Sequence, residues 1–208
     1  MKKMVNCEFC DELAAFKTSR IGKLYPELNS RVLIKTKNFS VIPTIGQLLS
    51  PMLMIITNDH YDRFSEIDEF PSYEFDTVVD EIQNRINAPV ILFEHGAKCT
   101  TGKACGVYHA HIHILPLISD FNPESLIGSG YHSFNNITDS FKFLAQTENY
   151  LLYRDNLGGF FCSTVEKSLN KEIFSSQYFR KWLTKNYVPD KDWNWNNYNF
   201  KEELPFVF

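Results

Sequence analysis

The sequence predicts an α+β protein: an antiparallel sheet with packed helices, followed by a C-terminal extension made of a hairpin and a helix. Short β-branched runs recur at hairpin spacing, and one amphipathic segment with helical periodicity stands between them. Of the 208 residues, 44% are hydrophobic and 15% aromatic. That is enough apolar surface for a sizeable core, so wholesale disorder is excluded.

The first half of the chain contains most of the predicted sheet. Residues 31–36 and 39–42 are strand-like runs that suit a hairpin, and residues 52–57 suit a buried strand. Residues 72–87 are predicted to form a helix, because apolar side chains recur at helical spacing until Pro89. Residues 90–93 and 106–117 are then predicted to be two further strands, joined by a loop at 94–105.

The second half changes in composition. Residues 119–140 are rich in Ser, Asn, Asp and Gly and are predicted to form a long loop. Residues 150–153 and 159–162 suit a hairpin, and residues 175–186 suit a helix before an aromatic tail. We therefore expect a core domain at 1–117 and an extension at 118–208 that packs on it.

Charge and cysteine content exclude several classes of protein. The formal net charge of −4 argues against a protein that grips long nucleic acid by charge alone. The most apolar window, residues 40–57, is broken by prolines and too short for a membrane span, so we expect no membrane partner. Five cysteines form no secreted disulfide pattern, and acidic residues follow Lys2 and Lys3, so a cytoplasmic, reducing location is expected.

Three histidines in one predicted strand are the most informative feature. His109, His111 and His113 alternate with Ala110, Ile112 and Ile114. In a strand, alternate side chains share a face, so the three imidazoles lie together and the apolar side chains face a core. Such a row suits either a metal cage or nucleophilic catalysis, in which a neutral imidazole attacks phosphorus and forms a phosphoramidate that water cleaves.

The segment His109–Leu115 reads His-Ala-His-Ile-His-Ile-Leu and resembles the signature of the histidine triad (HIT) superfamily. Residues 39–43, 52–60 and 93–96 resemble further segments of bacterial members, so the resemblance covers roughly residues 5–118. It implies a HIT-like sheet and a nucleotide hydrolase that attacks the α-phosphorus of a dinucleoside polyphosphate or phosphoramidate. A nucleotidyltransferase or phosphorylase using the same intermediate, and a nucleotide-binding adaptor without turnover, are the alternatives.

The resemblance also implies roles for particular residues. His111 would be the nucleophile, and His113 would hold phosphate oxygens and assist the leaving group or the water. His95 and Gln177 would contact a small-molecule nucleotide substrate, as would backbone amides around Gly106, where relatives often carry Ser or Thr. A homodimer is the oligomeric state that the family suggests, unless the extension replaces that interface.

Cys7 and Cys10 form a C-x-x-C half-site whose position suits zinc better than redox chemistry. Zinc-bearing relatives complete such a site with a His after the second strand and the first triad His, which implies a structural zinc on Cys7, Cys10, His60 and His109. The competing set takes Cys99 and Cys105 in place of the two histidines. A third hypothesis places one catalytic ion on His109, His111 and His113 together.

Two features near the C-terminus have both a structural and a functional interpretation. Gln177 and Arg180 lie three apart on one helical face and could reach a phosphate or ribose, although Arg180 beside Lys181 is more often a solvated charge. Trp193 and Trp195 could stack a base but are more often used to dock a tail onto a core.

Overall fold

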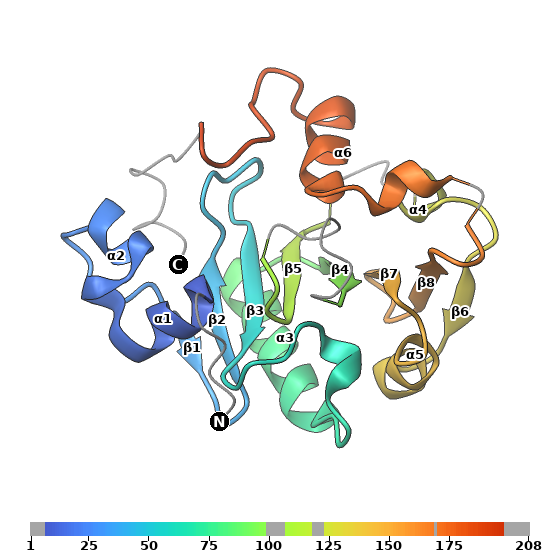
Figure 1. Ribbon diagram of the computed structural model, residues 1–208, viewed down its shortest axis with the longest axis horizontal. Coiled ribbons are helices and arrows are strands. Elements are labelled where there is room, and N and C mark those ends of the chain that lie inside the picture. Colours follow the sequence, from blue (N-terminus) through green and yellow to red (C-terminus); the bar gives the residue numbers. More distant parts are fainter. Residues whose placement is uncertain (1–6, 99–106, 118–122, 169, 198–208) are drawn as a thin grey trace.

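The computed structural model describes residues 7–98, 107–117, 123–168 and 170–197, and these form an eight-stranded sheet whose neighbouring strands are all antiparallel (Figure 1). In sheet order the strands are β1 (Ile34–Lys35), β2 (Phe39–Pro43), β3 (Leu53–Thr57), β5 (His111–Pro116), β4 (Val90–Ala97), β7 (Asn149–Arg154), β8 (Phe160–Thr164) and β6 (His132–Phe134). The predicted α+β class with an antiparallel sheet is confirmed. The order places β5, which carries two of the three histidines, between β3 and β4.

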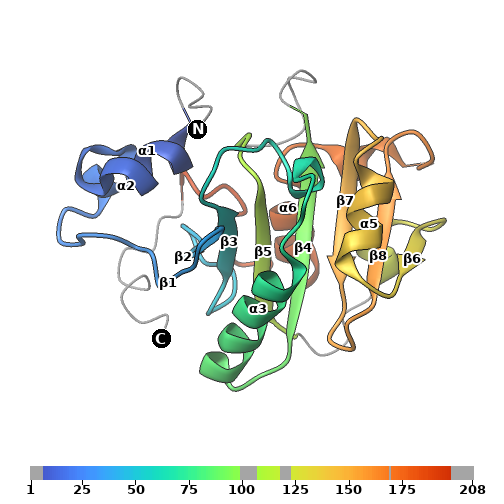
Figure 2. The same ribbon diagram turned by 90° about the horizontal axis from the view of Figure 1, so that it is seen from below.

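Helices cover both faces of this sheet. α3 and α5 lie on one face and α6 on the other, whereas α1 and α2 stand beyond the β1 end (Figures 1 and 2). The helices are α1 (Glu8–Ala15), α2 (Arg20–Leu24), α3 (Ser72–Ile86), α4 (Pro123–Ile127), α5 (Ile137–Leu144) and α6 (Tyr178–Asn186), with 3-10 turns η1 (Phe16–Thr18), η2 (Phe64–Glu66) and η4 (Lys171–Phe174).

The face covered by α3 and α5 holds the larger apolar core. Ile112 and Ile114 of β5 point into it and are 1% and 0% exposed. The predicted helical periodicity is confirmed, because four side chains of α3 are buried in this core: Phe75, Val78, Val79 and Ile82. Each such side chain stabilises the fold by roughly 1.5–3 kcal/mol. The strand therefore alternates as predicted, with aliphatic side chains on this face.

The opposite face is packed by the C-terminal extension. Phe179 of α6 stacks on Phe93 of β4, with ring centroids 4.2 Å apart. Leu115, Leu151 and Leu183 lie in the same buried cluster. α6 thus covers the face of β4 and β5 on which the histidines lie.

The extension continues the sheet of the preceding residues. β7 pairs with β4 from Leu92↔Arg154 to Ala97↔Asn149, and β7 and β8 form the predicted hairpin. The predicted C-terminal helix is also present, although it begins at Tyr178. The division at residue 117 stays a prediction, because residues 118–122 lie outside the described part.

The predicted loop at 119–140 is wrong over most of its described length. α4, β6 and the first turns of α5 occupy it. Leu126, Ile127 and Ile137 from these elements are 0–3% exposed. Their segments are too short for a periodic pattern to show, and packing against the sheet stabilises them instead. Among the described residues, no helix is long and apolar enough to cross a membrane.

Candidate active site and metal centre

The two histidines of β5 are held in place by strands on both sides. His111 lies opposite Ile56 of β3, and His113 lies opposite Met54 of β3 and Phe93 of β4. An interior strand has its backbone groups engaged on both edges, so its side chains are well positioned. The rings of His111 and His113 lie edge to face, 5.3 Å apart. They therefore form a fixed pair on the face opposite the larger core.

His111 makes one hydrogen bond that decides which of its nitrogens is free. Its Nδ1 lies 2.7 Å from the carbonyl oxygen of His109. A carbonyl only accepts, so Nδ1 carries the proton and donates it. Nε2 is left with an unprotonated lone pair, and the His111 side chain lines a cavity. This is the tautomer that a nucleophilic imidazole requires.

Burial keeps both imidazoles neutral. It lowers the pKa of His111 below the usual histidine range, while the hydrogen bond to the His109 carbonyl acts in the opposite direction. It lowers the pKa of His113 further, and electrostatic interactions with His111 and with the charged Arg180 add to the effect. Nδ1 of His113 is buried and has no hydrogen-bond partner in the described part of the chain. His113 therefore has a polar atom left for a ligand.

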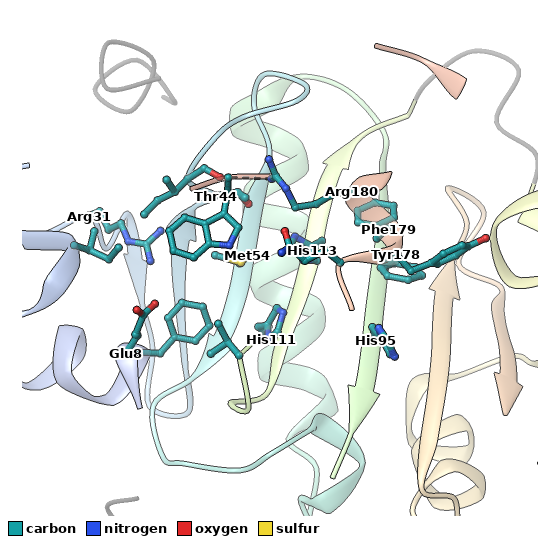
Figure 3. Close-up of a pocket in the computed structure, with 17 residues that line it drawn as sticks. Glu8, Arg31, Thr44, Met54, His95, His111, His113, Tyr178, Phe179 and Arg180 are labelled. Carbon is teal, nitrogen blue, oxygen red and sulfur yellow. Dashed lines mark hydrogen bonds between the residues drawn. The ribbon is translucent and has the colours of Figure 1, made fainter. Parts of the chain in front are cut away.

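The cavity beside these histidines runs across the sheet. The space in and in front of it measures about 820 Å³, which includes open solvent at the mouth. In Figure 3, Glu8, Arg31 and Thr44 lie on one side of His111 and His113, and His95 and Tyr178 lie on the other. α1, α2, the β2–β3 loop and β3 supply the first side together with Arg31, while β4 and α6 supply the second. A ligand bound at His111 thus meets two chemically different walls.

The predicted substrate-contacting residues lie in this cavity where the structure describes them. His95 lines it, and its Nε2 lies 2.9 Å from Oδ1 of Asn149. Burial lowers the pKa of His95 to about 4, and the bond to Asn149 acts against this shift. Gln177 lines the cavity from the N-terminal end of α6, with a left-handed backbone (φ 58°) and a buried Oε1 that lacks a partner among the described residues. Gly106 lies outside the described residues.

A second cluster lies next to the first. The side-chain ligand atoms of Cys7, Cys10, His60 and His109 are all within 4.8 Å of one another. Sγ of Cys7 is 3.3 Å from Nδ1 of His109, and Sγ of Cys10 is 3.4 Å from Nδ1 of His60. Ligand atoms on one tetrahedral zinc are separated by roughly 3.3–3.8 Å, given Zn–S and Zn–N distances of about 2.3 and 2.0 Å. The cluster could hold a metal ion.

The local fold explains how four distant residues meet. Cys7 caps α1, and Cys10 stands one turn later, so both thiols face the same direction. His60 follows β3 and His109 precedes β5, and these two strands are neighbours in the sheet. Nε2 of His109 lies 2.8 Å from the Thr57 carbonyl, so Nε2 is protonated and Nδ1 is free for an ion. Two thiolates and two imidazoles suit zinc.

Two other sets of metal ligands were expected from the sequence: Cys99 and Cys105 with the first two cysteines, and the three triad histidines. Cys99 and Cys105 lie outside the described residues, so the alternative ligand set is not placed. The structure keeps His111 and His113 out of the cluster that gathers around Cys7. Phe9, between the two cysteines, lies edge-on to the rings of both His109 and His111 at 5.5 and 5.8 Å. The metal cluster and the cavity therefore share one wall.

Sequence reasoning misplaced one residue and missed several. Arg180 is 5% exposed rather than solvated, and it donates to carbonyl oxygens of Trp193 at 2.6 Å and Gly46 at 2.7 Å. Phe9, Thr44 and Arg31 line the cavity but carried no motif. Their position depends on how α1 and the β2–β3 loop fold back, which no local pattern encodes. His132 lies away from the cavity, with Nε2 3.3 Å from Nζ of Lys167.

Comparison with solved structures gives similar proteins. A HIT family hydrolase from Clostridium thermocellum is 17% identical over 58% of this chain and 97% of its own, with a TM-score of 0.42. A protein from Clostridium difficile is 17% identical over 59% of this chain and 98% of its own (TM-score 0.43), and one from Sulfolobus tokodaii described as nucleotide-binding is 18% identical over 67% and 87% (0.38). All three are histidine triad proteins. That is the family which the triad motif resembles.

No family model and no curated protein sequence matches the chain. With identities below 20% and TM-scores below 0.5, the solved structures carry no information about the reaction. The chemistry must be argued from the residues of the site.

Proposed function

We propose that this protein is a histidine triad nucleotide hydrolase, which attacks the α-phosphorus of a dinucleoside polyphosphate or nucleoside phosphoramidate through a nucleotidyl-His111 intermediate. One observation supports it above all: Nδ1 of His111 donates to the His109 carbonyl, which leaves Nε2 unprotonated in the cavity. The lowered pKa of His111 keeps that lone pair available near neutral pH.

In the first step, the lone pair on Nε2 of His111 forms a bond to the α-phosphorus as the bond to the leaving group breaks. The leaving oxygen or nitrogen takes the bonding electron pair, and it takes its proton from solvent water at the open mouth of the cavity. The modified imidazole becomes cationic, and the His109 carbonyl stabilises it through the Nδ1 proton. His113, whose Nδ1 lacks a partner among the described residues, binds a phosphoryl oxygen and assists the leaving group.

In the second step, water attacks the same phosphorus and the bond to Nε2 breaks. The oxygen of the water bonds to phosphorus and its released proton passes to solvent, so that a nucleoside monophosphate leaves and Nε2 of His111 regains its lone pair. His95 and Gln177 would contact the substrate beside this phosphorus, as would amides around Gly106. Because Nδ1 stays bonded to a backbone acceptor throughout, the ring need not change its tautomer between turnovers.

Cys7, Cys10, His60 and His109 would hold zinc as a structural ion. Four protein ligands leave no open position for water, so the ion would stabilise the fold locally. Its expected effect on the reaction is indirect: it fixes His109, whose carbonyl orients His111.

A nucleotidyltransferase or phosphorylase would use the same intermediate and a different acceptor. The third triad position is His113, and this favours hydrolysis because the transferase branch of the superfamily that the sequence resembles usually has Gln at that position. Incubation with phosphate or a sugar phosphate separates the two. A nucleotidylated acceptor in place of the monophosphate would identify a transferase.

The decisive experiment mixes the protein with adenosine phosphoramidate or diadenosine tetraphosphate, quenches the reaction during turnover, and measures the mass of the protein. We expect an adenylyl adduct on His111, and His111→Asn should lower turnover by roughly a thousand-fold or more. His132→Asn is the matched control, because His132 lies away from the cavity. Equal turnover by wild type and His111→Asn would remove His111 as the nucleophile. Tight nucleotide binding without adduct or turnover would identify an adaptor.

A further inference from the structure

The two walls of the cavity differ in character, which bears on what each end binds. The wall beyond His111 toward α1 and α2 includes Phe9, Ile21, Ile45 and Met54, which are 3–6% exposed. Thr44 lies on the same side in Figure 3 and is 5% exposed, and its Oγ1 has no hydrogen-bond partner within the described residues. Glu8 and Arg31 lie on this side as well, paired with Arg20 and Glu12. A mostly apolar wall with one unpaired buried hydroxyl suits a flat ring that also carries polar atoms.

Trp195 completes this wall from the far end of the chain. It lines the cavity and packs against the cluster that contains Ile21 and Ile45. The segment after α6 therefore returns across the molecule to the N-terminal helices. An indole placed beside a phosphate-reactive histidine offers a face on which an aromatic ring can stack.

Three contacts of Arg20 hold the indole in place. The guanidinium of Arg20 lies over the Trp195 ring, 4.9 Å from its centroid. Nη2 of Arg20 donates to Oδ1 of the adjacent Asn196 at 2.9 Å, and Nη1 pairs with Glu8 at 2.7 Å. The Arg20 side chain is 53% exposed, so one face of the indole lies against a solvent-exposed guanidinium. The ring is thus fixed before a ligand arrives, which reduces the entropy lost on binding.

Trp193 provides an internal contrast. Its ring lies under Nζ of Lys181, at 4.8 Å, and it does not line the cavity. Its carbonyl oxygen accepts from Nε of Arg180, which anchors the segment to α6. Of the two tryptophans, Trp193 has contacts typical of docking, whereas Trp195 also faces the cavity.

We propose that Trp195 is a specificity-determining residue that stacks on the base of the bound nucleotide, so that the C-terminal extension supplies the base subsite together with Phe9 and Ile21. This inference rests on the proposed function, which places the α-phosphate at His111. It assigns the opposite end, at His95 and Tyr178, to the leaving group.

Calorimetric titration of the full-length protein with AMP and with ribose 5-phosphate tests this assignment, since the second ligand lacks only the base. Base stacking contributes about 1–3 kcal/mol, so Trp195→Ala should weaken AMP binding at least about five-fold. Its affinity for ribose 5-phosphate should equal that of the wild type. Trp195→Phe should restore most of the AMP affinity, and Trp193→Ala should leave both affinities unchanged.

The outcomes separate the two proposals. Unchanged AMP affinity in Trp195→Ala, or equal weakening of both ligands, would overturn the base subsite while leaving the hydrolase intact. Wild-type protein that binds neither ligand would overturn the proposed function and this inference with it. Should Trp195→Ala fail to fold, the Trp195→Phe variant and Arg20→Met, which releases the indole, carry the same comparison: Arg20→Met should weaken AMP alone.

Discussion

The carbonyl oxygen of His109 accepts the Nδ1 proton of His111 at 2.7 Å, while the side chain of His109 places its own Nδ1 3.3 Å from Sγ of Cys7. One residue thus contributes its backbone to the proposed nucleophile and its imidazole to the metal cluster. Nε2 of His109 is fixed in turn by the Thr57 carbonyl. The two sites are adjacent but chemically separate, and that separation can be measured.

Metal content distinguishes the cluster from a three-histidine ion site. We expect purified wild-type protein to hold one zinc per chain and Cys7→Ser to lose it, because three remaining ligands bind zinc far more weakly. His111→Asn should retain the ion. Cys162→Ser is the matched control, since Cys162 is buried in β8 away from the cluster. Elemental analysis after dialysis makes the measurement, and loss of zinc in His111→Asn would favour the three-histidine hypothesis.

The common face of the triad histidines and the pairing of Cys7 with Cys10 could be predicted from the sequence, because both depend on local spacing. Alternation at His109, His111 and His113 fixes their common face, and C-x-x-C at Cys7 fixes two thiols on one helical turn. The completion by His60 came from a resemblance rather than from spacing. Its position follows from the pairing of β3 with β5, which is a long-range contact.

The positions of the residues around the site could not be predicted from the sequence, because they too depend on long-range contacts. The positions of Arg180 and Trp195 depend on how α6 and the following segment cross the sheet. The burial of Glu94 depends on the pairing of β4 with β7. A charged residue next to Lys181 gives no local sign that carbonyl groups will surround it. The pairing of β7 with β4 likewise joins segments more than 50 residues apart.

A buried ion pair connects α1 to the cavity. Arg31 and Glu12 are 3% and 4% exposed, and Nη2 of Arg31 donates to Oε2 of Glu12 at 2.7 Å. Arg31→Met should lower the free energy of unfolding by about 3–5 kcal/mol, because it leaves a buried carboxylate unpaired. The double variant Arg31→Met/Glu12→Leu should recover much of that loss. Urea unfolding measures both, and a double variant as unstable as the sum of the single ones would show that the pair is not coupled.

Arg180 joins α6 to the β2–β3 loop and to the C-terminal segment. It donates to Gly46 and Trp193 carbonyls, and burial lowers its pKa to about 10, which still leaves it charged. Arg180→Met should cost roughly 1–3 kcal/mol of stability, because buried carbonyl groups lose their donor. Lys185→Met, at an exposed position on the same helix, should cost almost nothing. Equal thermal midpoints for the two variants would contradict the anchoring role.

The buried carboxyl group of Glu94 should make the free energy of unfolding depend on pH. It is 1% exposed, accepts from the Phe64 amide at 2.9 Å and from the Tyr150 hydroxyl at 2.9 Å, and burial raises its pKa to about 8. Between about pH 6.5 and 8 the folded protein therefore holds a proton that the unfolded chain, with a carboxyl pKa of about 4.3, has released. The contribution of Glu94 to stability must fall as the pH rises through this window, by up to about 1.4 kcal/mol per unit.

Glu94→Gln should remove that slope, because an amide of the same shape does not titrate. Its thermal midpoint should approach the wild-type value at pH 6.5 and exceed it at pH 8. The control is Glu81→Gln, where the side chain is 41% exposed and pairs with Arg85; it should follow the wild-type slope. Histidines buried in the neutral form act in the opposite direction, and their effect fades only above about pH 7.5 because unfolded imidazoles titrate near pH 6.5. Wild type and Glu94→Gln share these histidines, so the difference between the two slopes isolates the carboxyl group. A parallel slope in Glu94→Gln would show that the carboxyl group is ionised in the folded protein, with Arg63 compensating its charge.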